Sequence, residues 1–127
     1  MNIEHIDMLV VDDEPDAAQS LTLYMEQAGY DVRYALSGEA AMAALDLYQP
    51  LCVLLDFQMP GMDGLDLAKR IKQRFGDDVV LVAVTGMDAS SARVAETFTV
   101  VDHYFSKPIP MDKLARIFPG KDKRWPD

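Results

Sequence analysis

The side chains in this sequence that can do chemistry share one position, because each follows a short segment that reads as a strand. They are Asp12, Asp13 and Glu14 near the start, Asp56 in the middle, and Thr85 and Lys107 further on. In an open sheet of parallel strands, ligands bind beyond the carboxyl ends of the strands. If the segments are such strands, these six side chains gather at one edge although they lie far apart in sequence.

Gathered carboxylates repel one another, and the cluster is costly unless a cation neutralises it. The candidate ligands are hard oxygens, with no histidine or thiolate among them, which favours Mg²⁺ or Mn²⁺ over zinc. Lys107 adds a positive point charge and Thr85 adds a hydroxyl donor. A carboxylate nucleophile, a divalent cation, an ammonium and a hydroxyl suit phosphoryl transfer, which depends mainly on positioning and on neutralising charge.

Each of these residues, taken alone, also has a purely structural interpretation. Acids such as those from Asp12 to Glu14 favour the N-terminus of a helix. A threonine such as Thr85 is often a capping residue, and a lysine such as Lys107 is usually solvated. Only their joint occurrence after successive strands indicates a functional site.

The strands themselves are predicted from short apolar runs. Three runs are apolar at every position, which is typical of strands covered on both faces. These are Met8–Val11, Leu51–Leu55 and Val79–Val84. Two further segments, Asp31–Ala35 and Val101–Ser106, carry a less continuous apolar pattern.

Amphipathic stretches between these runs predict helices, because their apolar residues recur at helical spacing. The predicted helices are Pro15–Ala28, Gly38–Leu47, Gly64–Phe75, Asp88–Phe98 and Met111–Phe118. The order is strand then helix, five times. Crossovers of this length imply a doubly wound α/β fold, with a parallel sheet and helices on both faces.

Composition narrows the classes of function. The 127 residues suit one domain, and 21 acidic against 12 basic residues give a net charge of -9. This charge disfavours direct binding to nucleic acid, and no basic run suits an anionic membrane. A single cysteine, Cys52, excludes an internal disulfide. No apolar run is long enough to span a bilayer, and the first residues do not resemble a signal peptide. We therefore expect a cytoplasmic protein.

Four motifs follow the predicted strands in order. They are the acidic segment Val10–Glu14, the segment Leu54–Gly64 around Asp56, the hydroxyl segment Val84–Gly86, and the aromatic, lysine and proline segment Tyr104–Pro108. In this order and with this spacing they make the chain similar to the receiver domains of two-component response regulators, in which Leu54–Gly64 resembles the phosphoacceptor segment. The resemblance implies a flavodoxin-like (βα)5 fold with strand order 2-1-3-4-5. It covers residues 5–119, with a polar C-terminal tail over 120–127.

The resemblance also implies roles for individual residues. Asp56 would accept a phosphoryl group, and Asp13 and Asp56 would bind Mg²⁺ directly, with Asp12 acting mainly through water. The backbone carbonyl of Gln58 would be a further metal ligand. The phosphoryl oxygens would be held by Thr85 and Lys107, and the switch pair would be Thr85 and Tyr104. Thr99–Val101 departs from the family pattern, in which small residues and a glycine are common.

The expected function is that of a stand-alone signalling receiver. A sensor histidine kinase or a histidine phosphotransfer protein would phosphorylate Asp56, and the output would be binding to a further protein. The chain would not be an enzyme beyond self-phosphorylation and slow autodephosphorylation. Three alternatives are a receiver within or beside a hybrid kinase, a Mg²⁺-dependent phosphohydrolase with an aspartyl-phosphate intermediate, and a flavin-binding flavodoxin. The last is disfavoured because carboxylates after the first strand would repel the flavin phosphate.

Overall fold

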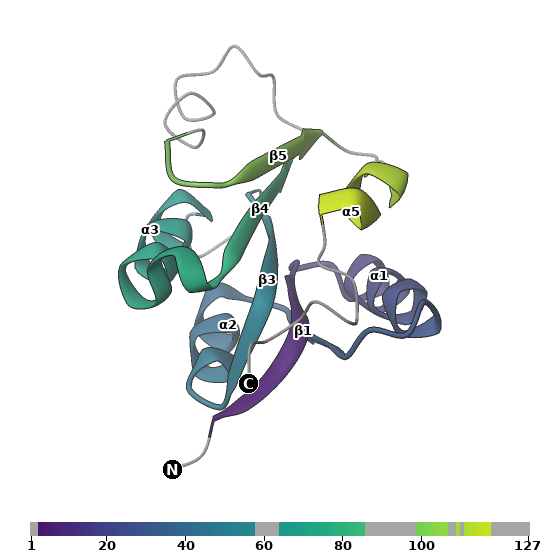
Figure 1. Cartoon of the computed structure of the whole chain (residues 1–127), viewed down its shortest axis with the longest axis horizontal. Helices are drawn as coiled ribbons and strands as arrows, with labels where there is room; N and C mark the ends of the chain where they lie inside the picture. Colours follow the sequence, from purple (N-terminus) through teal and green to yellow (C-terminus); the bar gives the residue numbers. More distant parts are fainter. Residues whose placement is uncertain (1–2, 58–63, 86–98, 107–108, 110, 118–127) are drawn as a thin grey trace.

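Five strands form one sheet in the computed structural model, which describes residues 3–57, 64–85, 99–106, 109 and 111–117. The strands are β1 (Glu4–Val11), β2 (Val32–Ala35), β3 (Tyr48–Asp56), β4 (Val80–Thr85) and β5 (His103–Ser106). All neighbouring strands are parallel, and their order is β2-β1-β3-β4-β5. The predicted doubly wound sheet and its strand order are therefore confirmed (Figure 1).

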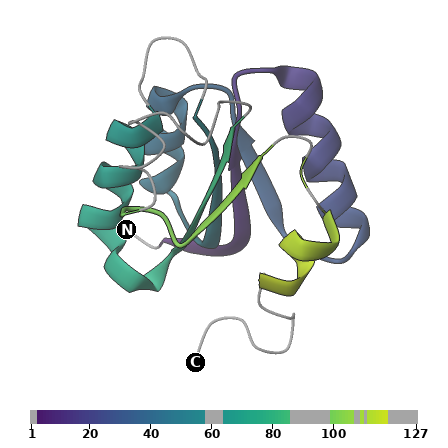
Figure 2. The same cartoon turned by 90° about the horizontal axis from the view of Figure 1, so that it is seen from above.

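Helices cover both faces of the sheet, as Figure 2 shows from above. They are α1 (Pro15–Gln27), α2 (Gly38–Leu45), α3 (Gly64–Phe75) and α5 (Met111–Ile117), with a short 3₁₀ helix, η1 (Gly76–Asp78), after α3. α1 and α5 lie on one face, and α2 and α3 lie on the other. None of the helices described is long and apolar enough to cross a membrane. The helix predicted over 88–98 and the tail predicted over 120–127 lie outside the described residues.

Each face of the sheet has its own hydrophobic core, because consecutive strand residues point to opposite faces. Leu9 and Val53 pack on the side of α2 and α3, whereas Met8 and Cys52 pack on the side of α1 and α5. This division explains why the strand segments are apolar at every position. Burial raises the pKa of the Cys52 thiol to about 12, and the charge of Asp102 adds to the effect. Cys52 is thus a protonated, buried packing residue.

Local sequence signals determine where the first two helices begin and end. α1 begins at Pro15, where a missing N–H costs nothing, and it stops before Gly29, whose φ of 101° suits glycine. The Ser37 side chain begins α2 by accepting the backbone N–H three residues on, at 3.0 Å. α2 ends at Leu45, two residues earlier than predicted, because the Leu47 N–H bonds the carbonyl three residues back at 2.9 Å.

Two strands begin earlier than their apolar runs, at Glu4 for β1 and at Tyr48 for β3. The second extension includes Pro50, which cannot donate to a neighbouring strand. β4 pairs with β3 only from Cys52 onward, so β3 has no β4 partner at the level of Pro50. Proline is tolerated at this position for that reason. Both strands begin with residues outside the apolar runs, so the apolar pattern alone predicted strands that are too short.

A buried carboxylate lies in the extended part of β1. Asp7 is only 1% exposed, and its Oδ2 accepts the backbone N–H of Asp31 at 2.7 Å. The Asp7 N–H in turn donates to the Asp31 carbonyl at 2.9 Å. A buried polar group is costly unless it is hydrogen-bonded. This pair of bonds therefore both satisfies Asp7 and ties β1 to the residue that precedes β2.

A second aspartate joins β4 to the segment that leads into β5. The Asp102 N–H donates to the Leu81 carbonyl at 2.8 Å, and its Oδ2 accepts the Leu81 N–H at 2.7 Å. The same Oδ2 accepts a hydrogen bond from Lys72 Nζ on α3 at 2.8 Å. The carboxylate thus takes the place of a strand carbonyl opposite Leu81, which is fully buried.

This joint gives a test of which of its bonds matters for stability. Asp102→Ala should lower the free energy of unfolding by about 1–3 kcal/mol, because it leaves the buried Leu81 N–H without that acceptor. Lys72→Met should cost at most about 1 kcal/mol, because it removes only a partly exposed ion pair. Urea denaturation of both variants measures the difference, and equal losses would contradict the assignment.

Candidate functional site

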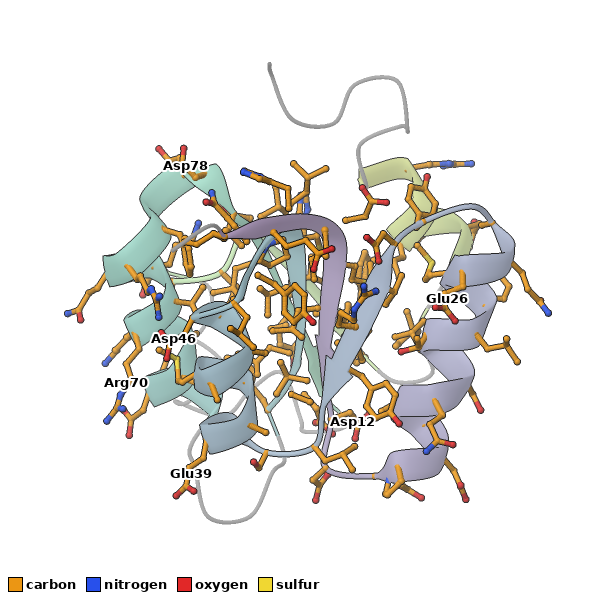
Figure 3. The ribbon with its side chains drawn as sticks, turned by 90° about the horizontal axis from the view of Figure 1, so that it is seen from below. Asp12, Glu26, Glu39, Asp46, Arg70 and Asp78 are labelled. Atoms are coloured by element: carbon orange, nitrogen blue, oxygen red, sulfur yellow. The ribbon has the colours of Figure 1, made fainter. Side chains whose placement is uncertain are left out.

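Three of the predicted carboxylates meet at the carboxyl edge of the sheet. β1 and β3 are neighbours, with Val11 opposite Leu55, so the residues that follow these two positions come together. Carboxylate oxygens of Asp12, Asp13 and Asp56 all lie within 4.8 Å of one another. Figure 3 shows Asp12 at the end of the sheet where α1 begins. The prediction that these acids gather is therefore confirmed for the three.

Rigid elements hold these carboxylates in place. Asp56 is the last residue of β3, is 4% exposed, and lies opposite Val84 of β4. The Asp12 N–H donates to the Ala35 carbonyl at 3.1 Å, and Asp12 Oδ1 accepts the Glu14 N–H at 3.0 Å. The second bond turns the chain from β1 into α1. Both carboxylates are therefore held by backbone pairing rather than by a flexible loop.

The residue after Asp56 is held just as closely. The Phe57 N–H donates to the Val84 carbonyl at 3.0 Å, and its side chain packs on the core that faces α2 and α3. Gly64, the first residue of α3, lies so close that a Cβ there would stand 2.8 Å from the Phe57 Cα. Glycine is required at this position by the close approach of α3 to the end of β3.

The other predicted site residues are placed less completely. Thr85 ends β4, and its backbone lies opposite Ser106 of β5, at the same edge of the sheet as Asp56. The Thr85 side chain, Gln58 and Lys107 lie outside the described residues, so their predicted roles stay predictions. Tyr104 lies in β5 opposite Ala83 and is half-buried. Burial raises the pKa of its phenol above the usual value.

A cavity of about 310 Å³ opens beside the carboxylates, between the sheet and α1. Among the described residues that line it, Asp12, Glu14 and Asp56 form an acidic end, and the other walls are apolar. Those walls are Val10, Val11, Ala17, Leu21, Leu54, Val84 and Ile109. Sequence reasoning did not find this cavity, because Leu21 was interpreted only as part of the apolar stripe of an amphipathic helix.

The donor set of the cluster fits a small, hard cation. Mg²⁺ binds oxygen ligands at about 2.0–2.1 Å, usually through one or two carboxylates with waters completing its shell. Oxygens gathered within 4.8 Å, two of them on residues that reach solvent, leave such an ion both ligands and room for water. Mutual repulsion of the three carboxylates favours the same outcome. Asp12, Asp13 and Asp56 are the described residues that would hold it.

The fold and the site together define a class of protein: doubly wound α/β domains with a carboxylate cluster at the carboxyl edge of the sheet, suited to cation and phosphoryl chemistry. Within that class, the model of the response regulator receiver domain matches residues 8–118. The chain belongs to this family. Receiver domains generally bind Mg²⁺, work with a histidine kinase, and are signalling domains rather than enzymes. The family thus supports neither the phosphohydrolase nor the flavodoxin alternative.

Curated relatives and solved structures agree with this assignment. The response regulator MprA of Mycolicibacterium vanbaalenii is 34% identical over 107 residues, which cover 84% of this chain and 46% of MprA. The chain thus spans about half the length of the curated relatives it matches. Among solved structures, a CheY-like receiver domain from Methanospirillum hungatei has a TM-score of 0.77, with 25% identity over 91% of both chains.

A second solved structure bears on the cation. The response regulator TrrA from Thermotoga maritima, solved in complex with Mg²⁺ and BeF, has a TM-score of 0.75 and 27% identity. The match covers 91% of this chain and 96% of TrrA. The strand order 2-1-3-4-5 and the placement of the acidic cluster therefore lie within a fold in which a Mg²⁺ complex has been observed.

The repulsion in the cluster predicts that one carboxylate can be neutralised with a gain in stability. In EDTA, Asp13→Asn should raise the free energy of unfolding by about 1 kcal/mol, the Coulomb energy of two unit charges about 4 Å apart in water. Added Mg²⁺ should stabilise the native chain, because a ligand that binds the folded state shifts the folding equilibrium toward that state. Mg²⁺ should stabilise Asp13→Asn less than the native chain, because the variant lacks one carboxylate of the cluster. Urea titrations with and without Mg²⁺ measure both effects.

Asp16→Asn is the matched control, because Asp16 is an exposed acid in the first turn of α1 and lies outside the cluster. It should respond to Mg²⁺ as the native chain does. An equal response of Asp13→Asn and the native chain would show that Asp13 does not take part in cation binding.

The contact between α3 and β3 predicts the effect of a methyl group at Gly64. Alanine normally stabilises a helix relative to glycine, but Gly64→Ala should lower the free energy of unfolding by about 1–3 kcal/mol, because its Cβ collides with the Phe57 backbone. Lys69→Ala, at an exposed position of the same helix, should change stability little. A Gly64→Ala variant as stable as Lys69→Ala in urea would contradict the close approach.

Proposed function

We propose that this receiver domain accepts a phosphoryl group on Asp56, in the presence of Mg²⁺, from a sensor histidine kinase or a histidine phosphotransfer protein. One observation carries the proposal: the nearly buried Asp56 carboxylate has oxygens of Asp12 and Asp13 within 4.8 Å. A carboxylate and a phosphoryl group are both negatively charged and repel each other. A carboxylate that attacks a phosphoryl group therefore needs a cation that offsets the charge of the two groups. The neighbouring acids supply the place for that cation.

The remaining roles follow the family pattern and are part of the proposal. Asp13 and Asp56 bind Mg²⁺ directly, Asp12 acts mainly through water, and the Gln58 carbonyl adds a ligand. Mn²⁺ is the alternative ion, since it prefers the same oxygen ligands. Bound Mg²⁺ neutralises charge on the phosphoryl oxygens, and Thr85 and Lys107 hold those oxygens. The position of Thr85 at the end of β4, beside the end of β3, supports its part.

The switch pair Thr85 and Tyr104 belongs to the proposal as well. The backbones of these residues lie on the adjacent strands β4 and β5, two register positions apart. Phosphorylation adds negative charge and acceptor oxygens at the carboxyl edge. A shift between existing conformations then changes which proteins bind. If the half-buried Tyr104 side chain moves when Thr85 moves, it would carry this change to the protein surface. We therefore propose that the output is binding to a further protein.

The extent of the receiver is proposed as residues 5–119, with a polar tail over 120–127. The curated relatives are about twice as long as this chain. Action as a stand-alone regulator therefore stays a prediction, beside the alternative of a receiver within or next to a hybrid kinase. Two further statements also stay predictions. The first is that the chain does not bind nucleic acid or membrane directly, and the second is that it is cytoplasmic. The net charge of -9 supports the first of these.

The phosphoacceptor is tested by intact mass after incubation with Mg²⁺ and acetyl phosphate. The native chain should gain one phosphoryl group, and Asp56→Asn should gain none, because an amide is not a nucleophile toward phosphorus under these conditions. EDTA should suppress the gain in the native chain. Asp46→Asn, at an exposed aspartate far from the cluster, is the matched control and should be phosphorylated normally. An adduct on Asp56→Asn to the native extent would overturn the assignment.

A further inference from the structure

The strand β5 has little in its own composition to fix how it pairs. It has four residues, and among the described strands it pairs with β4 alone. None of its residues is fully buried, whereas β1 is buried at every position from Ile6 to Val11. A fully buried face specifies the register of a strand strongly, and a partly exposed one specifies it weakly. A further contact is therefore needed to fix which residue of β4 each residue of β5 faces.

Asp102, the residue before β5, supplies such a contact through two hydrogen bonds to a single residue. Its N–H donates to the Leu81 carbonyl at 2.8 Å, and its Oδ2 accepts the Leu81 N–H at 2.7 Å. Lys72 on α3 donates to the same Oδ2 at 2.8 Å and holds the carboxylate in place. One side chain thus joins the start of β5 to both β4 and α3.

The two bonds to Leu81 form together in only one register. Consecutive strand residues point to opposite faces, so a shift of β5 by one residue would turn Phe105 away from the core on which it packs. A shift by two residues keeps the faces, but it places Val100 or Tyr104 opposite Leu81. Neither of these side chains offers a carboxylate to the Leu81 N–H. Asp102 therefore favours the observed register over those that the pleat would otherwise allow.

We propose that Asp102 is a positioning residue for phosphoryl transfer: by fixing the register of β5, it sets where Lys107 reaches the carboxyl edge. This inference rests on the proposed function of Asp56 and Lys107. Ser106 lies opposite Thr85 at that edge, and Lys107 is the next residue of the chain. A shift by two residues would move Lys107 along the sheet by about 6.6 Å, because a strand rises about 3.3 Å per residue.

Such a displacement would separate the Lys107 ammonium from the phosphoryl oxygens, because an ion pair needs its N and O atoms within about 4 Å. A misplacement of about 1 Å at a reacting centre can already cost about a hundredfold in rate. The proposed Mg²⁺ ligands Asp12, Asp13 and Asp56 lie at the ends of β1 and β3 rather than on β5. Loss of Asp102 should therefore slow phosphorylation and leave Mg²⁺ binding intact.

The first experiment measures the rate of phosphorylation of the full chain as a function of acetyl phosphate concentration, by intact mass at saturating Mg²⁺. Asp102→Ala should lower the maximal rate by about tenfold or more. Asp102→Asn keeps an oxygen that can accept the Leu81 N–H, so its rate should stay within about threefold of the native rate. Lys72→Met removes only the ion pair and should also stay within about threefold.

A matched control separates positioning from a general loss of stability. Ile6→Val removes a buried CH2 group from β1 and destabilises the domain without touching β5, so it should keep the native rate. The dissociation constant for Mg²⁺, measured by protection against urea, should be the same for Asp102→Ala and the native chain. If Asp102→Ala fails to fold, Asp102→Glu replaces it, because its longer side chain moves the carboxylate away from the Leu81 N–H.

The register itself is measured by NMR, independently of phosphorylation. His103 lies opposite Val82 in the native pairing. Cross-strand contacts between these two residues should persist in Asp102→Asn and be lost or weakened in Asp102→Ala.

A double variant shows whether Asp102 acts through Lys107. Lys107→Met alone should slow phosphorylation by about a hundredfold, as expected for the loss of one group that stabilises the transferred charge. Adding Asp102→Ala should slow it no further, because the group that Asp102 positions is already absent. Losses that multiply would show that Asp102 acts elsewhere and would overturn the positioning role.

The outcomes separate this inference from the proposed function. A native rate in Asp102→Ala, unchanged contacts between His103 and Val82, or an equal loss of rate in Ile6→Val would overturn the role of Asp102 while Asp56 remains the phosphoacceptor. No adduct on native Asp56, from acetyl phosphate or from a histidine kinase, would overturn both. A slow Asp102→Ala with native Mg²⁺ affinity, together with rescue by Asp102→Asn, supports the positioning role.

Discussion

Repulsion among three carboxylates is the constraint on which the rest of this structure depends. Oxygens of Asp12, Asp13 and Asp56 are held within 4.8 Å, and Asp56 has little access to water. Isolated acids would move apart. Here the backbone of Asp12 is bonded to Ala35, and Asp56 continues the pairing of β3 with β4. The stability of the sheet is used to hold these like charges together, and in the proposed function they attract a cation and, through it, a phosphoryl group.

The two faces of the sheet contribute differently to this task. On the side of α2 and α3 the core is continuous, and even the approach of α3 to β3 leaves no room for a Cβ at Gly64. On the side of α1 and α5 the same sheet borders the cavity beside Asp56. One face is packed up to the strand ends, and the other face leaves a cavity beside them. Close packing on one side is therefore what permits an open site on the other without loss of position.

Much of the fold was predictable because its signals are local. Apolar runs such as Leu51–Leu55 marked strands, and Pro15 with Gly29 marked a helix. The site was predictable in part, since Asp12, Asp13 and Asp56 follow strands that had to be neighbours. Pairings between distant residues were not predictable. The hydrogen-bond partner of buried Asp7 can be predicted only if β2 is known to lie beside β1. The tolerance of proline at Pro50 can be predicted only if it is known where β4 begins to pair with β3.

The cavity beside Asp56 could not be predicted for a related reason. A cavity is defined by atoms that do not meet, and no pattern in one helix records how far the opposite wall stands. Leu21 and Ile109 are apolar, and the simplest expectation for both is burial against each other or the core. Their apolar character is compatible equally with a packed interface and with a hollow one. Only the spacing of α1, the sheet and the segment before α5 decides between the two.

The same sheet also links the site to its far edge. β5 is the last strand, with four residues, and the segment before it is bound to β4 and α3 through Asp102. The other end of β5, at Ser106, lies opposite Thr85 at the carboxyl edge. Tyr104 lies between these ends, so its surroundings depend on both the anchor and the site.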